Sequence, residues 1–278
     1  MDDGIDMSLV QINFYSHQLR KNTNVTIVLP YGNWQDIDSS SDLSEYGKKE
    51  YPSLYLLHGY QGDNLSWLRN SEVEKFAERH QCIVIMPSGD NSFYINLSSM
   101  KLNYENFIIS ELRRYIEKTF PISRNREYRA IAGLSMGGYG ALRLGFLYPE
   151  LYAYIGAFSP PYVTTDMDIS PFFHSEFREA STLFFGEPET WGSSTYDTYK
   201  LLDELKSRCD EKEVEVPYIY LACGEQDSLI EGNRKMAKKL ATSEFNYKYV
   251  EGSGGHIWSY WNRHLSKFMS EFSKYTNQ

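Results

Sequence analysis

The feature that most constrains this chain is a serine between two glycines, Gly133-x-Ser135-x-Gly137. Before it, residues 128–134 form the apolar run of a buried strand, and after it residues 138–144 open a helix. A serine in such a turn adopts a strained backbone so that its oxygen points out of the sheet. Glycine is required where a Cβ would clash with neighbouring backbone. The pattern predicts a nucleophile elbow, the turn that presents a reactive serine.

A plainer interpretation of the same residues is a glycine-rich turn around a capping serine. The elbow predicts more than that turn does. A helix that begins at the serine directs its N-terminal amides and the positive end of its dipole at a developing oxyanion. An acid and a histidine should then follow Ser135, in that order along the chain.

Both partners occur at strand ends. The strand expected at residues 216–223 runs into a turn that contains Asp227, with Glu225 as the alternative carboxylate. His256 ends a glycine-rich loop after the last expected strand, residues 247–250. Asp227 can also be read as a helix cap, and a lone histidine as a structural residue. The order of Ser135, Asp227 and His256 favours a catalytic triad.

A second turn offers the remaining group that such chemistry needs. The apolar strand at residues 53–58 ends in His58-Gly59, where hydrolases with this elbow place an oxyanion-binding amide. We expect the backbone N–H groups of Tyr60 and Met136 to form the oxyanion hole. His58 itself is expected to bond the backbone of the loop.

Substrate contacts are less constrained by the sequence. We expect Trp67, Trp258 and Gln61 to bind substrate, and residues 92–94 to reach toward the same pocket. Both tryptophans suit the core equally well. Aromatic residues make up 15% of the chain, which is compatible with a carbohydrate or aryl pocket but also with packing at half-buried surfaces.

Charge and cysteine content exclude several classes of function. The formal net charge of −9 argues against a nucleic acid or an anionic membrane as partner and fits a neutral small molecule. Three cysteines without close spacing do not make a disulfide framework. No His-Glu-x-x-His or similar metal-ligand spacing occurs, so we expect neither a metal nor another cofactor. Without an apolar leader or spanning segment, we expect a cytoplasmic protein, and a homo-oligomer is compatible with the sequence.

Strands and helices alternate along most of the chain, which predicts an α/β fold built from parallel βαβ units with helices on both faces of the sheet. Two alternating segments near the N-terminus, residues 10–16 and 24–29, predict a hairpin with one wet face. Residues 103–120 predict an amphipathic helix. The whole chain, 1–278, is expected to form one domain. Residues 162–195 break the rhythm and predict a small cap over the strand ends, or else an ordinary surface insertion.

Four stretches together resemble the esterase D-type family of α/β-hydrolases: residues 132–140 (Ala-Gly-Leu-Ser-Met-Gly-Gly-Tyr-Gly), 56–59 (Leu-Leu-His-Gly), 223–227 (Cys-Gly-Glu-Gln-Asp) and 255–261 (Gly-His-x-Trp-x-x-Trp). The likeness runs from about residue 10 to 272 and is greatest for bacterial tributyrin esterases and acetylesterases. It implies the α/β-hydrolase fold and the same triad and oxyanion amides. S-formylglutathione hydrolases of this family usually carry histidine where Tyr139 stands, which makes that activity less expected.

These observations predict a serine carboxylesterase for short-chain acyl, carbohydrate or aryl esters, working through an acyl-enzyme. The same triad would serve an acyltransferase or a thioesterase like S-formylglutathione hydrolase. A non-catalytic binding protein on a hydrolase fold is a further alternative, although the presence of all three triad residues argues against it.

Overall fold

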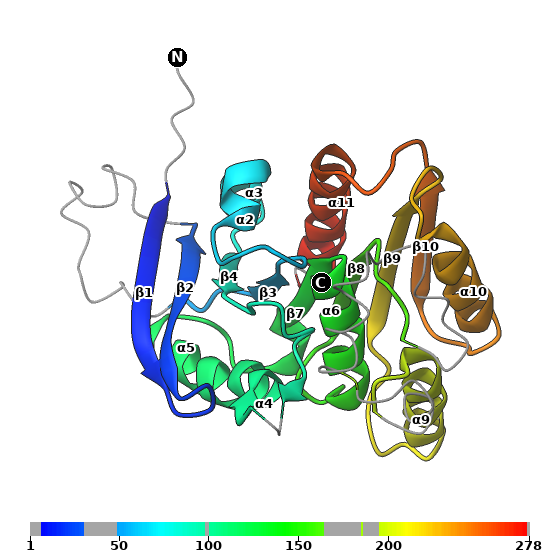
Figure 1. The fold of residues 1–278 in the computed structure, drawn as a ribbon, viewed down its shortest axis with the longest axis horizontal. Helices are drawn as coiled ribbons and strands as arrows, with labels where there is room; N and C mark the ends of the chain where they lie inside the picture. The colour runs from blue at the N-terminus through cyan, green and yellow to red at the C-terminus, as the bar shows by residue number, and fades with distance from the viewer. Residues whose placement is uncertain (1–6, 31–48, 98–99, 164–184, 186–194, 277–278) are drawn as a thin grey trace.

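An eight-stranded sheet forms the centre of the molecule (Figure 1). The structure, a computed structural model, describes residues 7–30, 49–97, 100–163, 185 and 195–276. The strands of the sheet lie in the order β1-β2-β4-β3-β7-β8-β9-β10. Their bounds are β1 (Ser8–Ser16), β2 (Lys21–Leu29), β3 (Ser53–Leu57), β4 (Ile83–Pro87), β7 (Arg129–Leu134), β8 (Tyr154–Phe158), β9 (Tyr218–Gly224) and β10 (Tyr247–Gly252). A separate small hairpin pairs β5 (Asn96–Leu97) with β6 (Leu102–Asn103).

The strands from β4 to β10 in this sheet are mutually parallel, whereas β1 and β2 form an antiparallel hairpin at one edge. The predicted α/β class and N-terminal hairpin are confirmed. β1 alternates half-buried and exposed residues because one of its faces meets water, while β3, β4, β7 and β8 are buried throughout. Continuous apolar runs therefore mark the strands that are covered on both faces.

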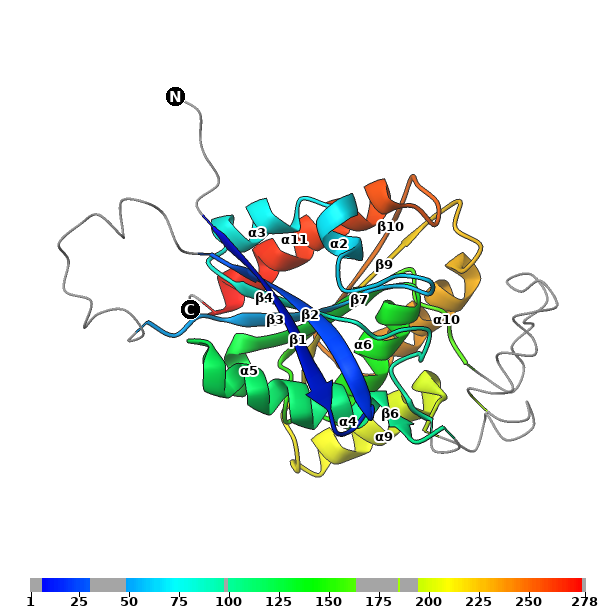
Figure 2. The same ribbon diagram turned by 60° about the vertical axis from the view of Figure 1, so that its left-hand side comes forward.

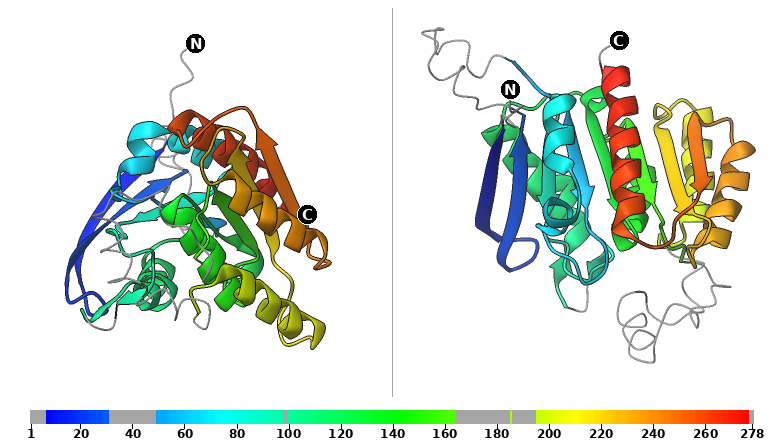
Figure 3. Two further views of the ribbon diagram at one scale, coloured as in Figure 1. Left: turned by 45° about the vertical axis from the view of Figure 1, so that its right-hand side comes forward. Right: turned by 90° about the horizontal axis from the view of Figure 1, so that it is seen from above.

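Helices cover both faces of the sheet, as Figures 2 and 3 show. On one face lie α2 (Ser66–Asn70), α3 (Val73–Arg79) and α11 (Trp258–Thr276). On the other lie α4 (Tyr104–Asn106), η2 (Phe107–Leu112), α5 (Arg113–Thr119), α6 (Met136–Leu147), α9 (Thr198–Asp210) and α10 (Ile230–Ala241), with the short turn η3 (Arg126–Tyr128) before β7. Each face has its own cluster of buried apolar side chains. Among the described residues, no helix is both long and apolar enough to cross a membrane.

The helix predicted over residues 103–120 is present as one run, but its middle, η2, is a π-helix. Phe107 and Ile108 are both fully buried there, although they are neighbours in sequence. A π turn is wider than an α turn, which suits the burial of two adjacent large side chains. A pattern of apolar residues does not distinguish the two helix types over a single turn.

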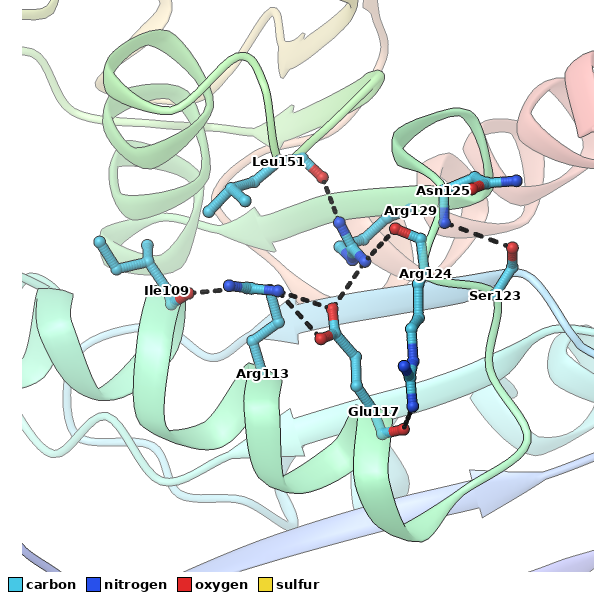
Figure 4. A network of polar contacts seen from close by, with 8 residues as sticks. All are labelled: Ile109, Arg113, Glu117, Ser123, Arg124, Asn125, Arg129 and Leu151. Atoms are coloured by element: carbon cyan, nitrogen blue, oxygen red, sulfur yellow. Dashed lines mark hydrogen bonds and ion pairs between the residues drawn. The ribbon is translucent and has the colours of Figure 1, made fainter.

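A partly buried polar network fixes the N-terminal end of β7 (Figure 4). The Arg129 guanidinium donates to the Glu117 carboxylate at 2.8 Å and to the Leu151 carbonyl at 3.0 Å. Arg113, one turn before Glu117 on α5, donates to the same carboxylate at 2.8 Å. The strand that leads to Ser135 is thereby held against α5 and the chain that enters β8.

The carboxyl ends of the parallel strands lie along one edge of the sheet, where ligands bind in open α/β sheets. The turns after β3, β7, β8, β9 and β10 meet at this edge. The cap predicted at residues 162–195 falls almost entirely outside the described residues, so the single-domain and cap predictions stay predictions.

Candidate active site

Ser135 occupies the turn between β7 and α6, which confirms the predicted strand, turn and helix. Its backbone has φ 50° and ψ −120°, a strained conformation for a residue with a side chain. A Cβ on Gly137 would lie 2.6 Å from the His58 carbonyl oxygen, and one on Gly133 would lie 2.8 Å from the Leu57 carbonyl oxygen. Both glycines are required because neighbouring backbone fills the space where a side chain would stand.

His256 joins Ser135 to Asp227. Its Nε2 lies 3.0 Å from the Ser135 Oγ, and its Nδ1 lies 2.9 Å from the Asp227 Oδ2. An ionised carboxylate only accepts hydrogen bonds, so Nδ1 carries a proton and Nε2 is left to accept from the Ser135 hydroxyl. This is the tautomer in which a histidine can take a proton from a serine.

Asp227 and His256 lie in two turns that are hydrogen-bonded to each other. Gln226 N–H donates to the Gly254 carbonyl at 2.9 Å, and Gly254 N–H donates to the Gln226 side chain at 2.7 Å. These two hydrogen bonds hold the turn after β9 against the loop before α11. The neighbouring Glu225 is exposed, and the carboxylate that meets His256 is that of Asp227.

The Asp227 side chain is completely buried, whereas that of His256 is 36% exposed. Burial alone would raise the pKa of Asp227, but hydrogen bonds from His256, the Leu229 N–H and Ser159 hold this pKa below its ordinary value. The carboxylate therefore stays ionised beside the imidazole. The Leu229 N–H donates to Oδ1 at 2.9 Å, so Asp227 also holds the turn before α10. It does not cap that helix as the alternative interpretation had it, because the N-cap residue of α10 is Leu229.

The loop after β3 runs beside the serine. A Cβ on Gly59 would lie 3.5 Å from the Ser135 Cβ, which brings Tyr60 close to the elbow. Met136 is the first residue of α6, so its N–H has no acceptor within the helix. These positions agree with the expected pair of oxyanion amides, whose role stays a prediction.

His58 holds this loop in place. Its Nδ1 lies 2.7 Å from the Gly59 carbonyl, and its Nε2 accepts from the Gly89 N–H at 2.8 Å. Desolvation by burial lowers the pKa of His58, which keeps the ring neutral and able to accept. The expected structural role of this histidine is confirmed.

The residues expected to bind substrate lie in different surroundings. Trp67 is 1% exposed and donates its indole N–H to the Leu57 carbonyl at 2.9 Å, on the face of the sheet that α11 covers. Trp258 is half-buried and packs edge-on against Trp67, with ring centroids 5.3 Å apart. Gln61 is exposed in the loop after β3, and its N–H donates to the Asn91 side chain at 2.7 Å. Of the three, Gln61 is the most accessible.

Aromatic side chains also lie near the loop after β3, and no sequence motif marks them as residues of the site. Phe93, from the stretch expected to reach the pocket, is 4% exposed and packs on Tyr60 and Phe185 at centroid distances of 6.1 and 5.0 Å. Tyr94 is fully buried and donates to the His58 carbonyl at 3.0 Å. Two further side chains, Ser159 and Trp261, interact with Asp227 and His256 respectively. Trp261 ends the Gly-His-x-Trp-x-x-Trp stretch of the family resemblance, whereas Ser159 belongs to none of the motifs. Their proximity depends on the strand order.

Comparisons with known proteins agree with this geometry. Residues 16–272 match the family described as "Putative esterase". An acetyl esterase from Caldicellulosiruptor saccharolyticus is 32% identical over 96% of this chain and 99% of its own. An endo-1,4-beta-xylanase/feruloyl esterase from Xylanibacter ruminicola is 25% identical over 96% of this chain, which spans 31% of that protein. The crystal structure of an S-formylglutathione hydrolase from Staphylococcus aureus is similar with a TM-score of 0.80 and 25% identity, over 96% of this chain and 99% of that one.

The fold of this chain is therefore that of the α/β-hydrolase esterases, with a serine, a histidine and an aspartate gathered at the edge where such a sheet binds its ligands. Since one family model covers the chain from the first hairpin to the last helix, and a relative aligns with it almost end to end, the protein belongs to the Putative esterase family and is a carboxylic ester hydrolase.

Proposed function

We propose that this protein hydrolyses esters of short acyl groups, acetyl above all, through an acyl-enzyme on Ser135. The observation that carries the proposal is the position of His256, whose two ring nitrogens lie 3.0 Å from the Ser135 Oγ and 2.9 Å from the Asp227 Oδ2. That bridge is the geometry a histidine needs to act first as a base and then as an acid.

In the first half of the reaction, the Ser135 Oγ attacks the ester carbonyl while His256 Nε2 takes the hydroxyl proton. The tetrahedral oxyanion accepts hydrogen bonds from the backbone N–H groups of Tyr60 and Met136. Removing one such donor typically costs a factor of about 10² to 10³ in kcat. His256 then gives its proton to the leaving alcohol, and the acyl group stays on Ser135.

In the second half, water loses a proton to His256 and attacks the carbonyl of the acyl-enzyme. The tetrahedral intermediate then collapses: the bond from the acyl carbon to the Ser135 Oγ breaks, His256 gives its proton to that oxygen, and the carboxylic acid is released. Asp227 keeps Nδ1 protonated and stabilises the imidazolium in both halves. The nucleophile of the first half and the acid–base group of both halves come from the chain, water is the second substrate, and His256 ends each half of the reaction neutral.

The substrate class is inferred from the relatives. The acetyl esterase aligns over nearly its full length, which supports a short acyl group. The feruloyl esterase relative supports a wider acid or alcohol side, so acetylated or feruloylated carbohydrates are the proposed class. The S-formylglutathione hydrolase structure supports the thioester S-formylglutathione as the second candidate substrate.

The test is hydrolysis of p-nitrophenyl acetate, butyrate and octanoate, of methyl ferulate and of S-formylglutathione by the wild type and by Ser135→Ala. We expect activity highest on the acetate and lower by roughly 10⁴-fold or more in the variant. Ser243→Ala is a control for loss of a serine hydroxyl away from the site, because Ser243 is buried and bonds the Leu240 carbonyl at the end of α10. Equal activity in Ser135→Ala and the wild type would reject the proposed nucleophile.

A further inference from the structure

Directly after β8, Ser159 lies behind the pair formed by Asp227 and His256. Its side chain is fully buried, and its φ of 51° lies in the left-handed region, which residues with a side chain rarely adopt. Its backbone N–H donates to the Ala222 carbonyl at 2.7 Å, which fixes this turn against β9. Strained residues that persist beside an active site are candidates for a functional role.

Trp261, in the first turn of α11, connects Ser159 to His256. The indole Nε1–H donates to the Ser159 Oγ at 3.1 Å. The indole ring meets the imidazole of His256 edge-on, with centroids 4.8 Å apart and an interplanar angle of 88°. With only 5% of its surface exposed, Trp261 has little freedom to move. One rigid side chain therefore contacts both the histidine and the serine behind the carboxylate.

The hydroxyl proton of Ser159 needs an acceptor inside the protein. An indole N–H only donates, so Trp261 uses a lone pair of the Ser159 Oγ and leaves the O–H free to donate. Because Ser159 is fully buried, bulk water does not reach it. Two side chains interact with this hydroxyl, the Asp227 carboxylate and the Cys223 thiol. A carboxylate is much the stronger acceptor.

We propose that Ser159 and Trp261 are positioning residues for the triad: Ser159 donates its hydroxyl proton to the Asp227 carboxylate, and Trp261 holds both Ser159 and the ring of His256. The proposal rests on the triad of the proposed function. With the Leu229 N–H on Oδ1 at 2.9 Å and Ser159 as a second donor, the carboxylate is held in the one orientation that presents Oδ2 to His256.

The charge state of Asp227 agrees with this arrangement. Burial on its own raises the pKa of a carboxyl group, yet the pKa of Asp227 lies below its ordinary value, with Ser159 among the groups that lower it. Burial also raises the pKa of Cys223, so its sulfur stays a neutral thiol and a weak acceptor. Of the two neighbouring acceptors of the Ser159 hydroxyl proton, only the Asp227 carboxylate is therefore charged.

The experiment compares Ser159→Ala with Ser159→Gly, using p-nitrophenyl acetate. Both variants lack the hydroxyl, but glycine relieves the backbone strain that alanine retains. We expect kcat to fall about ten- to hundredfold in both, the usual worth of a hydrogen bond to a charged group, with KM unchanged because Ser159 does not face the substrate. Ser243→Ala, the buried serine away from the site, should keep the kcat of the wild type.

A double-mutant cycle tests the connection through Trp261. Trp261→Phe keeps a ring beside His256 but loses the N–H donor. Its effect on kcat should be clearly smaller in the Ser159→Ala background than in the wild type, because the hydrogen bond it removes is then already absent. Equal effects in the two backgrounds would overturn the role of Trp261.

The result that would overturn the role of Ser159 is wild-type kcat in either Ser159 variant, or a rise in KM with kcat retained. Circular dichroism and thermal unfolding establish that each variant is folded before kinetics are compared. Failure of this proposal is distinguishable from failure of the proposed function. If Ser135→Ala is inactive while Ser159→Ala is as active as the wild type, the triad stands and the positioning role falls.

Discussion

Gly137 shows how tightly a single residue of the elbow is constrained. A Cβ there would lie 2.6 Å from the His58 carbonyl oxygen, closer than such atoms approach in real structures. The obstacle is backbone of β3 and its loop, which has no rotamer through which to yield. The same backbone carries the proposed oxyanion amide of Tyr60, so any accommodation displaces the site.

Gly137→Ala is therefore expected to lower the free energy of unfolding by about 2–4 kcal/mol and to reduce esterase activity in the protein that still folds. Gly252→Ala is the matched control, because nothing lies within 4 Å of a Cβ at Gly252. The control should be neutral or slightly stabilising. Urea unfolding and hydrolysis of p-nitrophenyl acetate measure both effects, and indistinguishable variants would contradict the steric argument.

The residues of the elbow and its partners could be predicted from sequence because backbone geometry restricts them. A serine in that turn needs glycine at fixed spacing, and the strand ends place Asp227 and His256. Trp67 could not be assigned in this way, since a large aromatic side chain serves a pocket and a core equally well. Its burial depends on packing against Phe158 and Trp258, which are distant in sequence.

Between elements, a buried ion pair joins α6 to the helical run before α5. The Arg143 guanidinium lies 2.6 Å from the Glu105 carboxylate, and the two side chains are 3% and 11% exposed. Arg143 also donates to the Thr195 carbonyl at 2.9 Å, and Tyr148 donates to Glu105 at 2.6 Å. The helix that follows Ser135 is thus anchored by charge as well as by apolar packing.

Arg143→Met should lower the free energy of unfolding by about 3–5 kcal/mol, because it leaves the buried Glu105 charge without its cation. The double variant Arg143→Met/Glu105→Leu should be more stable than Arg143→Met alone. Arg69→Met, which breaks an ion pair with exposed partners, should cost less than about 1 kcal/mol. Urea unfolding measures each value, and a double variant less stable than Arg143→Met would count against the ion-pair argument.

At the scale of elements, alternating patterns predicted strands and helices well, because burial on one or both faces leaves a period in the sequence. No such periodic pattern indicates the ion pair, because Glu105 and Arg143 are 38 positions apart (143 − 105) and come into contact only in the folded chain. The π-helical turn of η2 was missed for a related reason, since its apolar residues fit an α-helix equally well over so short a stretch.

Across the whole molecule, buried histidines make stability depend on pH. His264 on α11 is 2% exposed, and its Nδ1 lies 2.9 Å from the Tyr220 hydroxyl. Desolvation, together with the positive charges of Lys267, Arg263 and Lys248, lowers its pKa from 6.5 to about 4. Unfolding frees this ring to take up a proton at a higher pH than the native state allows.

The contribution of the neutral His264 ring to the free energy of unfolding is therefore fully present above pH 6.5. It is lost as the pH falls from 6.5 toward 4. We expect the free energy of unfolding to decline over this window in the wild type, and to decline less steeply in His264→Gln. Urea unfolding at about pH 7, 5.5 and 4.5 measures how steeply the free energy of unfolding depends on pH in the wild type and in the variant. An unchanged slope in the variant would show that other groups govern acid stability.

The α/β class followed from the alternation of strands and helices along the chain, and the α/β-hydrolase fold was implied by the family resemblance. The order of strands around the sheet, and hence the meeting of Ser159 with Trp261, depends on contacts between distant segments that no local pattern records.

The anchors on either side of residues 164–194 have an evolutionary consequence. Before this stretch, the Tyr162 ring stacks on Tyr199 at a centroid distance of 5.1 Å, and the Tyr162 hydroxyl donates to Asn233 at 3.2 Å. After it, Arg143 holds Thr195. Both anchors are made by residues of the helices α6, α9 and α10, and neither uses a residue of the proposed triad. We therefore expect evolution to tolerate changes of sequence and length between these two points, because neither anchor depends on Ser135, Asp227 or His256.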